Sequence, residues 1–189
     1  DDEKIREEYG GHPPQNTTIP LWNYTIKEWL QLILKGRRAQ CTNHMRARRI
    51  RHLVGRKIWR DYFTFCVERN PWDKAVSLYY WRTKKMNHRP DFSEFLRSAR
   101  AHKLSNFKLY AIGGKAAVDR VYKYEEMDNA LKDIAKKTGL PELSELPRTK
   151  SRSRRDRRDY REFMNDGDRE FIAKKCTREI GLMGYTFGE

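Results

Sequence analysis

A turn in the first half of the chain combines residue types that can bind a phosphate. Arg69 and Asn70 follow an apolar and aromatic run, and Pro71 begins a pattern typical of a helix. Asn70 is a favourable N-cap, Pro71 suits the first helical position, and Asp73 favours the positive end of the helix dipole. Such a turn would place free backbone N–H groups and the Arg69 guanidinium around one point, and Ser77 can add a hydroxyl. The spacing therefore predicts a phosphate site.

The elements that must position this turn are predicted from hydrophobic periodicity. The apolar run over 62–68 indicates a strand packed on both faces, and a helix over about 71–86 follows it. Other helices are expected at 26–34, 44–60, 92–96, 125–138 and 168–181, and short strands at 107–112 and 116–122. Glycines mark the expected ends and breaks: Gly36, Gly55, the Gly113-Gly114 turn and Gly139. Strands alternating with helices predict an α/β fold with a mostly parallel sheet flanked by helices.

Length and charge limit the function classes. A chain of 189 residues suits a single domain over 1–189, with a loop-rich start at 1–20 and a basic loop at 146–160. The net charge of +15 favours a polyanionic partner: a nucleic acid, an acidic glycan or an anionic nucleotide. No apolar run approaches the roughly 20 residues that cross a bilayer. We expect a cytoplasmic protein; a lumenal domain separated from its anchor would have the same pattern.

Cysteine usage argues against metal or thiol chemistry. The three cysteines have no spacing typical of metal ligands, so no metal site is expected. Cys66 falls in the strand pattern and Cys176 on an apolar helix face, and both are interpreted as core residues.

The turn also resembles a known family. The run Arg69-Asn70-Pro71-Trp72-Asp73-Lys74, followed by Ser77 and Tyr79, is similar to the 3′-phosphate-binding segment of sulfotransferases that use 3′-phosphoadenosine 5′-phosphosulfate (PAPS). The carbohydrate sulfotransferases, Golgi-type and bacterial, are the most similar group. The segments 117–127, 146–151 and 184–187 also resemble later parts of that family, so the likeness covers roughly 40–188. It implies a P-loop-NTPase-like fold with Arg69 and Ser77 on the cofactor's 3′-phosphate.

One element of that family has no counterpart here. Family members carry an earlier loop with Lys, Gly and Thr or Ser that wraps the 5′-phosphosulfate. Residues 1–20 lack it, and Gly113-Gly114-Lys115 lies between two expected strands and is interpreted as a turn. Because sulfuryl transfer depends on stabilising charge on the leaving phosphate, the chain is interpreted as an N-terminally incomplete fragment or an inactive homologue. The intact remainder of the pattern favours the fragment.

Other site residues follow from the resemblance. His44 corresponds to a histidine near the acceptor of related enzymes and is the candidate general base, the alternative being a surface or capping histidine. Lys150 and Arg152 would lie near the cofactor's phosphates if the basic loop folds over them; otherwise this loop is solvated or touches an acidic glycan. Glu68 is expected to pair with an arginine, and Glu125 to be a structural partner at a helix start.

Aromatic side chains near the turn have two interpretations. Trp72, Tyr79, Tyr80 and Trp81 could stack on an adenine or a sugar, but core packing is favoured for most of them.

Two function classes result. The leading hypothesis is an enzyme that moves a sulfuryl group from PAPS to a hydroxyl, expected to belong to a glycan. The alternative is a non-catalytic basic protein that binds nucleic acid or another polyanion. No nucleic-acid-binding motif accompanies the charge, so nucleic acid ranks lower as a partner.

Overall fold

The computed structural model of the chain describes residues 17–42, 44–141 and 158–188. These residues form two compact units, which we call the N-terminal unit (up to Asp61) and the C-terminal unit (from Tyr62). Each is described by itself. The expectation of a single domain stays a prediction.

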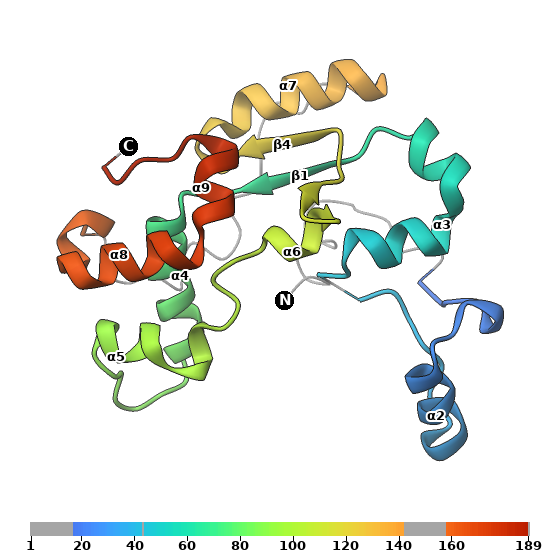
Figure 1. Cartoon of the computed structure of the whole chain (residues 1–189), viewed down its shortest axis with the longest axis horizontal. Helices are drawn as coiled ribbons and strands as arrows, with labels where there is room; N and C mark the ends of the chain where they lie inside the picture. The colour runs from blue at the N-terminus through green and yellow to red at the C-terminus, as the bar shows by residue number, and fades with distance from the viewer. Residues whose placement is uncertain (1–16, 43, 142–157, 189) are drawn as a thin grey trace. The chain divides into compact units, whose positions relative to one another are not determined.

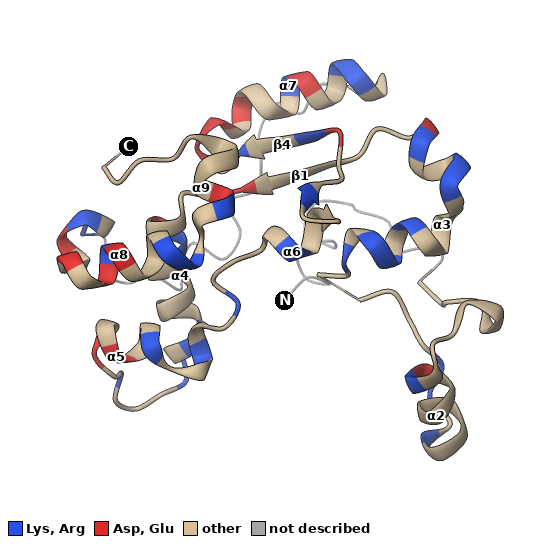
Figure 2. Ribbon diagram, in the orientation of Figure 1, with Lys and Arg blue, Asp and Glu red and all other residues tan. Residues whose placement is uncertain are grey.

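The N-terminal unit is helical. Its elements are η1 (Leu21–Asn23), α2 (Ile26–Lys35) and α3 (Ala47–Asp61). The Thr25 hydroxyl caps α2 by accepting from the Glu28 N–H, and the Glu28 carboxylate accepts from the Thr25 N–H in return. Gly55 interrupts α3 with a φ of 82°, a left-handed conformation that favours glycine, so the predicted break is confirmed. Lys and Arg residues occur along much of α3 (Figure 2).

The C-terminal unit contains every named strand of the described residues. Its elements are β1 (Phe65–Glu68), α4 (Pro71–Thr83), α5 (Phe92–Arg97), η2 (Ala99–Ala101), α6 (Phe107–Tyr110), β2 (Ala111–Ile112), β3 (Lys115–Ala116), β4 (Arg120–Lys123), η3 (Tyr124–Glu126), α7 (Met127–Thr138), η5 (Tyr160–Phe163), α8 (Asp166–Lys175) and α9 (Thr177–Met183). The class is therefore α/β, as predicted.

A parallel pair of strands organises this unit. β1 and β4 run side by side, with Phe65 opposite Arg120 and Glu68 opposite Lys123 (Figure 1). Helix α7 packs along β4. β2 and β3 form a separate antiparallel hairpin around the Gly113-Gly114 turn, so the interpretation of that segment as a turn is confirmed. Because β1 and β4 are parallel, both deliver the residues that follow them to the same edge.

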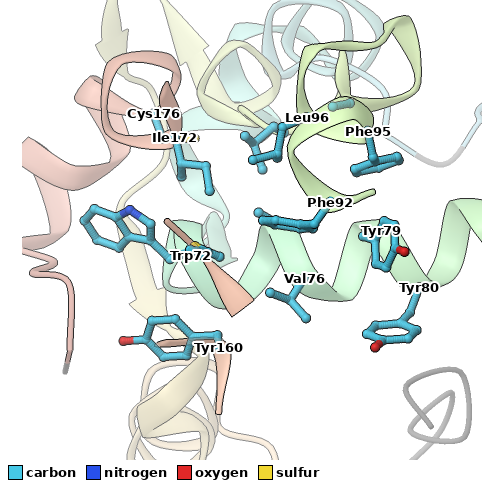
Figure 3. Packing of buried hydrophobic residues seen from close by; sticks show 14 of the residues in the cluster. Trp72, Val76, Tyr79, Tyr80, Phe92, Phe95, Leu96, Tyr160, Ile172 and Cys176 are labelled. Atoms are coloured by element: carbon cyan, nitrogen blue, oxygen red, sulfur yellow. The ribbon is translucent and has the colours of Figure 1, made fainter. Parts of the chain in front are cut away.

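The core of the C-terminal unit surrounds α4. Side chains from α5, η5 and α8 converge on this helix, as Figure 3 shows. Aromatic rings dominate the contact: Tyr79 meets Phe92 and Phe95 at centroid separations of 5.5 and 5.2 Å. Full burial of one such side chain stabilises the fold by about 1.5–3 kcal/mol. The helix that begins at the candidate phosphate turn is therefore held on several sides.

Four expectations about elements were wrong. The strand expected over 116–122 is two separate strands, β3 and β4, and only β4 pairs with β1. The strand expected over 62–68 spans only 65–68, and Phe65 and Val67 are exposed rather than packed on both faces. The strand expected over 107–112 begins as helix α6, because the buried Glu179 carboxylate accepts from the Asn106 and Phe107 N–H groups and fixes a helical turn there. The helix expected over 168–181 is two helices, since Cys176 has non-helical angles (φ −111°, ψ 23°).

Candidate functional site

The predicted cap at the start of α4 forms, but it uses the backbone donors that were expected to be free. Asn70 Oδ1 accepts from the Trp72 N–H (3.0 Å) and the Asp73 N–H (3.4 Å). The Asn70 N–H in turn donates to Glu125 Oε1 at 2.8 Å. Pro71 has no N–H to offer. The expectation of free backbone N–H groups was therefore wrong, and an anion at this turn must be held by side chains.

Arg69 lies at the edge of the turn and is oriented by two contacts. Its guanidinium pairs with the Asp73 carboxylate through both Nε and Nη2. Its central carbon also lies 5.0 Å from the centre of the Tyr124 ring, a cation–π geometry. The side chain keeps 30% of its area exposed. Arg69 is thus positioned before any ligand arrives, yet remains accessible to one.

Ser77 lies on the same face of α4 as the Arg69–Asp73 pair. Asp73 and Ser77 are four residues apart, so their side chains are neighbours on the helix surface. Ser77 is half-buried. Ser77 therefore neighbours the Asp73 carboxylate that pairs with Arg69. The ion pair between Asp73 and Arg69 is the feature that the sequence interpretation did not foresee.

The residues after β4 complete the edge. Tyr124 supplies the ring under Arg69, and Glu125 accepts from the Asn70 N–H with one oxygen and from the Tyr185 hydroxyl with the other (3.0 Å). The Tyr185 hydroxyl also lies 3.0 Å from the Glu68 carbonyl oxygen. The prediction that Glu125 is a structural partner is confirmed. Burial beside Glu125 raises the pKa of Tyr185, so this hydroxyl stays protonated and can donate.

A buried ion pair lies beneath the turn. Lys74 Nζ donates to Glu68 Oε2 at 3.0 Å, and the Glu68 side chain is only 1% exposed. Burial raises the pKa of Glu68, Lys74 opposes that rise, and the nearby carboxylate of Glu179 adds to it. The expected partner was an arginine, so that prediction was wrong in residue type. The pair connects the end of β1 with the first turn of α4.

Thiol chemistry is not supported at this site. Cys176 is buried, as predicted, and Cys66 is half-buried. Burial raises the pKa of each thiol to about 12, so both are neutral at pH 7 and poor nucleophiles.

Most of the aromatic residues of α4 pack in the core, the interpretation that the sequence favoured. Trp72, Tyr79 and Tyr80 are buried in the core, whereas Trp81 is partly exposed with Lys84 Nζ 3.5 Å from its ring centre. The first three are therefore unavailable for stacking on a ligand.

The remaining predicted site residues are not joined to this edge by the structure. His44 is exposed with a φ of 63° and belongs to the N-terminal unit, so its role as a base stays a prediction. Lys150 and Arg152 lie outside the described residues. Among the residues that are described, no group of His, Cys, Asp and Glu could hold a metal ion, and no helix is both long and apolar enough to cross a membrane.

Comparison with known proteins adds a relative without a known activity. The chain is 38% identical over 97 residues to an uncharacterised protein of Archaeoglobus fulgidus, a match that covers 49% of this chain and 81% of the relative. No protein-family profile matches the chain. No solved structure matches it either.

Proposed function

We propose that this chain, which belongs to the same family as the uncharacterised Archaeoglobus fulgidus protein, is a sulfotransferase domain that binds PAPS. In this proposal it transfers the sulfuryl group to a hydroxyl of a carbohydrate, within a P-loop-NTPase-like fold. One observation carries the proposal: Arg69, which follows β1, is oriented by Asp73 and the Tyr124 ring at the edge where β1 and β4 end, and Ser77 neighbours Asp73 on α4. The carboxyl edge of parallel strands is where α/β folds bind nucleotides.

The chemistry of Arg69 suits the cofactor's 3′-phosphate. A guanidinium has five N–H donors, and Asp73 engages the Nε edge. The donors on the other side of the fork can meet a phosphate while Asp73 and the Tyr124 ring keep the group in place. A charge-assisted contact of this kind contributes about 1.5–3 kcal/mol. Asp73 also repels an approaching phosphate, so the site requires the guanidinium to offset that charge.

The catalytic step uses residues beyond this edge. The acceptor hydroxyl must lose a proton as it attacks sulfur, and His44 is the proposed base. The leaving nucleotide phosphate gains negative charge, which Lys150 and Arg152 would stabilise. In this scheme the β1–α4 edge binds the cofactor and does not take part in the proton transfer.

The binding step is tested by comparing two nucleotides that differ in the 3′-phosphate. Isothermal titration of the full chain with 3′-phosphoadenosine 5′-phosphate and with AMP gives both affinities. We expect Arg69→Ala to weaken the affinity for 3′-phosphoadenosine 5′-phosphate by about 10- to 150-fold, which corresponds to a contact of about 1.5–3 kcal/mol. The affinity for AMP should be nearly unchanged.

Arg82→Ala is the matched control, because Arg82 is an exposed arginine in the last turn of the same helix. It should alter neither affinity. Equal losses for both nucleotides in Arg69→Ala, or no loss in either, contradict the assignment of the 3′-phosphate to this edge.

The second candidate function is polyanion binding without catalysis, favoured by the net charge of +15. Its signature is affinity for RNA or DNA that falls linearly with the logarithm of salt concentration. In that case Arg69→Ala and Arg82→Ala would cause similar small losses, since each removes one phosphate contact.

A further inference from the structure

The N-terminal unit presents an apolar helix face that none of its own described residues covers. Ile26, Ile33 and Leu34 of α2 are 83%, 74% and 75% exposed, and Trp22, just before the helix, is 85% exposed. Trp29 and Leu30 lie on the same side of the helix at helical spacing and are also exposed. Single exposed apolar residues are ordinary, but a contiguous stripe marks an interaction surface.

The opposite, polar side of α2 is the one that holds it to its unit. Arg49 of α3 donates to Glu28 Oε2 at 2.8 Å and to the Asn23 carbonyl oxygen at 2.7 Å. The capping box of Thr25 and Glu28 lies on that side as well. A surface helix of a soluble protein normally buries its apolar stripe and exposes its charges. Helix α2 does the reverse: its polar side contacts α3 through Glu28, and its apolar stripe lies on the other side.

Charge decides which partner suits this stripe. Residues 17–61 carry eleven Lys and Arg against only Glu28 and Asp61 as acids. Two copies meeting through α2 would bring two strongly cationic bodies together, which is unfavourable. A nucleic acid would pair with the Lys and Arg side chains, but it would not bury an apolar stripe of Ile, Leu and Trp. An anionic lipid surface satisfies both, because its headgroups attract Lys and Arg and its acyl boundary accepts apolar side chains.

We propose that α2 docks on the surface of an anionic bilayer. Its apolar stripe lies at the boundary between headgroups and acyl chains, where Trp22 and Trp29 are in their preferred environment. The exposed cations of the N-terminal unit, among them those along α3 in Figure 2, contact the anionic headgroups. Attachment is peripheral, since α2 has only ten residues and cannot span the hydrocarbon. This inference does not depend on the proposed enzymatic function.

Co-sedimentation of the full chain with vesicles tests the proposal. Vesicles of phosphatidylcholine alone are compared with vesicles that also contain phosphatidylserine. We expect binding to the mixed vesicles only, and binding at least about tenfold weaker in the double variant Ile33→Gln with Leu34→Gln. Glutamine is neutral, so a purely electrostatic attachment would leave this variant's binding unchanged.

Leu140→Gln is the matched control, because Leu140 is 63% exposed but lies in the C-terminal unit. It should bind the mixed vesicles like the unmodified chain. The proposal is overturned if the mixed vesicles do not bind the chain, or if the double variant binds as well as the control.

Two other measurements on the double variant identify the competing occupants. Analytical ultracentrifugation that shows a dimer in the unmodified chain and a monomer in the variant assigns the stripe to a second copy. A melting temperature lowered well below that of the control assigns it to packing within the chain itself. Either result overturns the proposal.

Discussion

Helices α2 and α4 both begin with a well-formed cap, but α4 is buried in a core and α2 is exposed on the surface. The Thr25 capping box starts α2, and the Asn70 side chain starts α4. Helix α4 buries residues on several sides, whereas α2 buries none. Most hydrophobic residues of α4 are buried in one aromatic core, which holds the turn in front of the helix. Most hydrophobic residues of α2 are exposed, so they can bind a partner but contribute little to the stability of the N-terminal unit.

The difference separates positioning from recognition. Arg69 can be held by Asp73 and Tyr124 because α4 and η3 are themselves fixed, by the core and by the Glu125 bridge to Asn70. Preorganised donors of this kind suit a small anion that must sit in one place. An apolar stripe on α2 fixes no atom of a partner and suits a broad, fluid surface.

The largest expected effect compares the same substitution in both regions. Ile172→Ala removes a side chain that is 0% exposed in the core and should lower the free energy of unfolding by about 2–5 kcal/mol. Ile33→Ala in α2 should change it by less than about 0.5 kcal/mol. Urea unfolding followed by circular dichroism measures both. Comparable losses at the two positions would mean that the α2 stripe is covered within the chain, and the contrast would fail.

A second prediction concerns the pH dependence that the buried Glu68 imposes on the C-terminal unit. Burial raises its pKa in the folded state above the value of about 4.3 in the unfolded state. The folded state therefore binds more protons between these two values, and this group's stabilising contribution decreases as the pH rises through that window. One such group contributes a slope of up to about 1.36 kcal/mol per pH unit.

Unfolding free energies at a series of pH values check this slope. Glu68→Gln should remove it, whereas Glu94→Gln, at an exposed position of α5, should leave it in place. An unchanged slope in Glu68→Gln would contradict the raised pKa of Glu68, and would mean that Lys74 fully offsets the effect of burial.

Local signals predicted the frame of the candidate site well. Asn70, Pro71 and Asp73 predicted the start of α4 because capping depends on residues within one turn. Gly36 and Gly139 end their helices in the left-handed conformation, as expected, for the same reason. The parallel β1–β4 pair fits the general expectation of a parallel sheet, but the strand expected over 116–122 is divided, and its first part belongs to the β2–β3 hairpin.

Distant partners account for two of the expectations that were wrong. The apolar pattern at 107–110 indicates a strand, but the Glu179 carboxylate, over seventy residues later, satisfies the N–H groups that start a helical turn. The donors expected to be free at the turn are used by Asn70 itself and by Glu125, which is 55 residues away from the N–H it accepts. The contact of Arg69 with Asp73 could have been read from the i,i+4 spacing of opposite charges. The contact of Arg69 with Tyr124 could not be predicted in this way, because it depends on how β1 and β4 are paired.

The smallest expected effect tests whether the two caps stabilise one cooperative structure. Asn70→Ala removes a cap that is 2% exposed, so it should lower the global free energy of unfolding by about 0.5–2 kcal/mol. Thr25→Ala removes an exposed cap of similar geometry, and there we expect faster hydrogen exchange confined to the α2 amides, because a helix with little buried area opens by itself. Exchange followed by mass spectrometry, alongside urea unfolding, distinguishes the two outcomes. A global loss in Thr25→Ala as large as that in Asn70→Ala would show that α2 unfolds together with the core, and its apolar stripe would then need an occupant inside the protein rather than outside it.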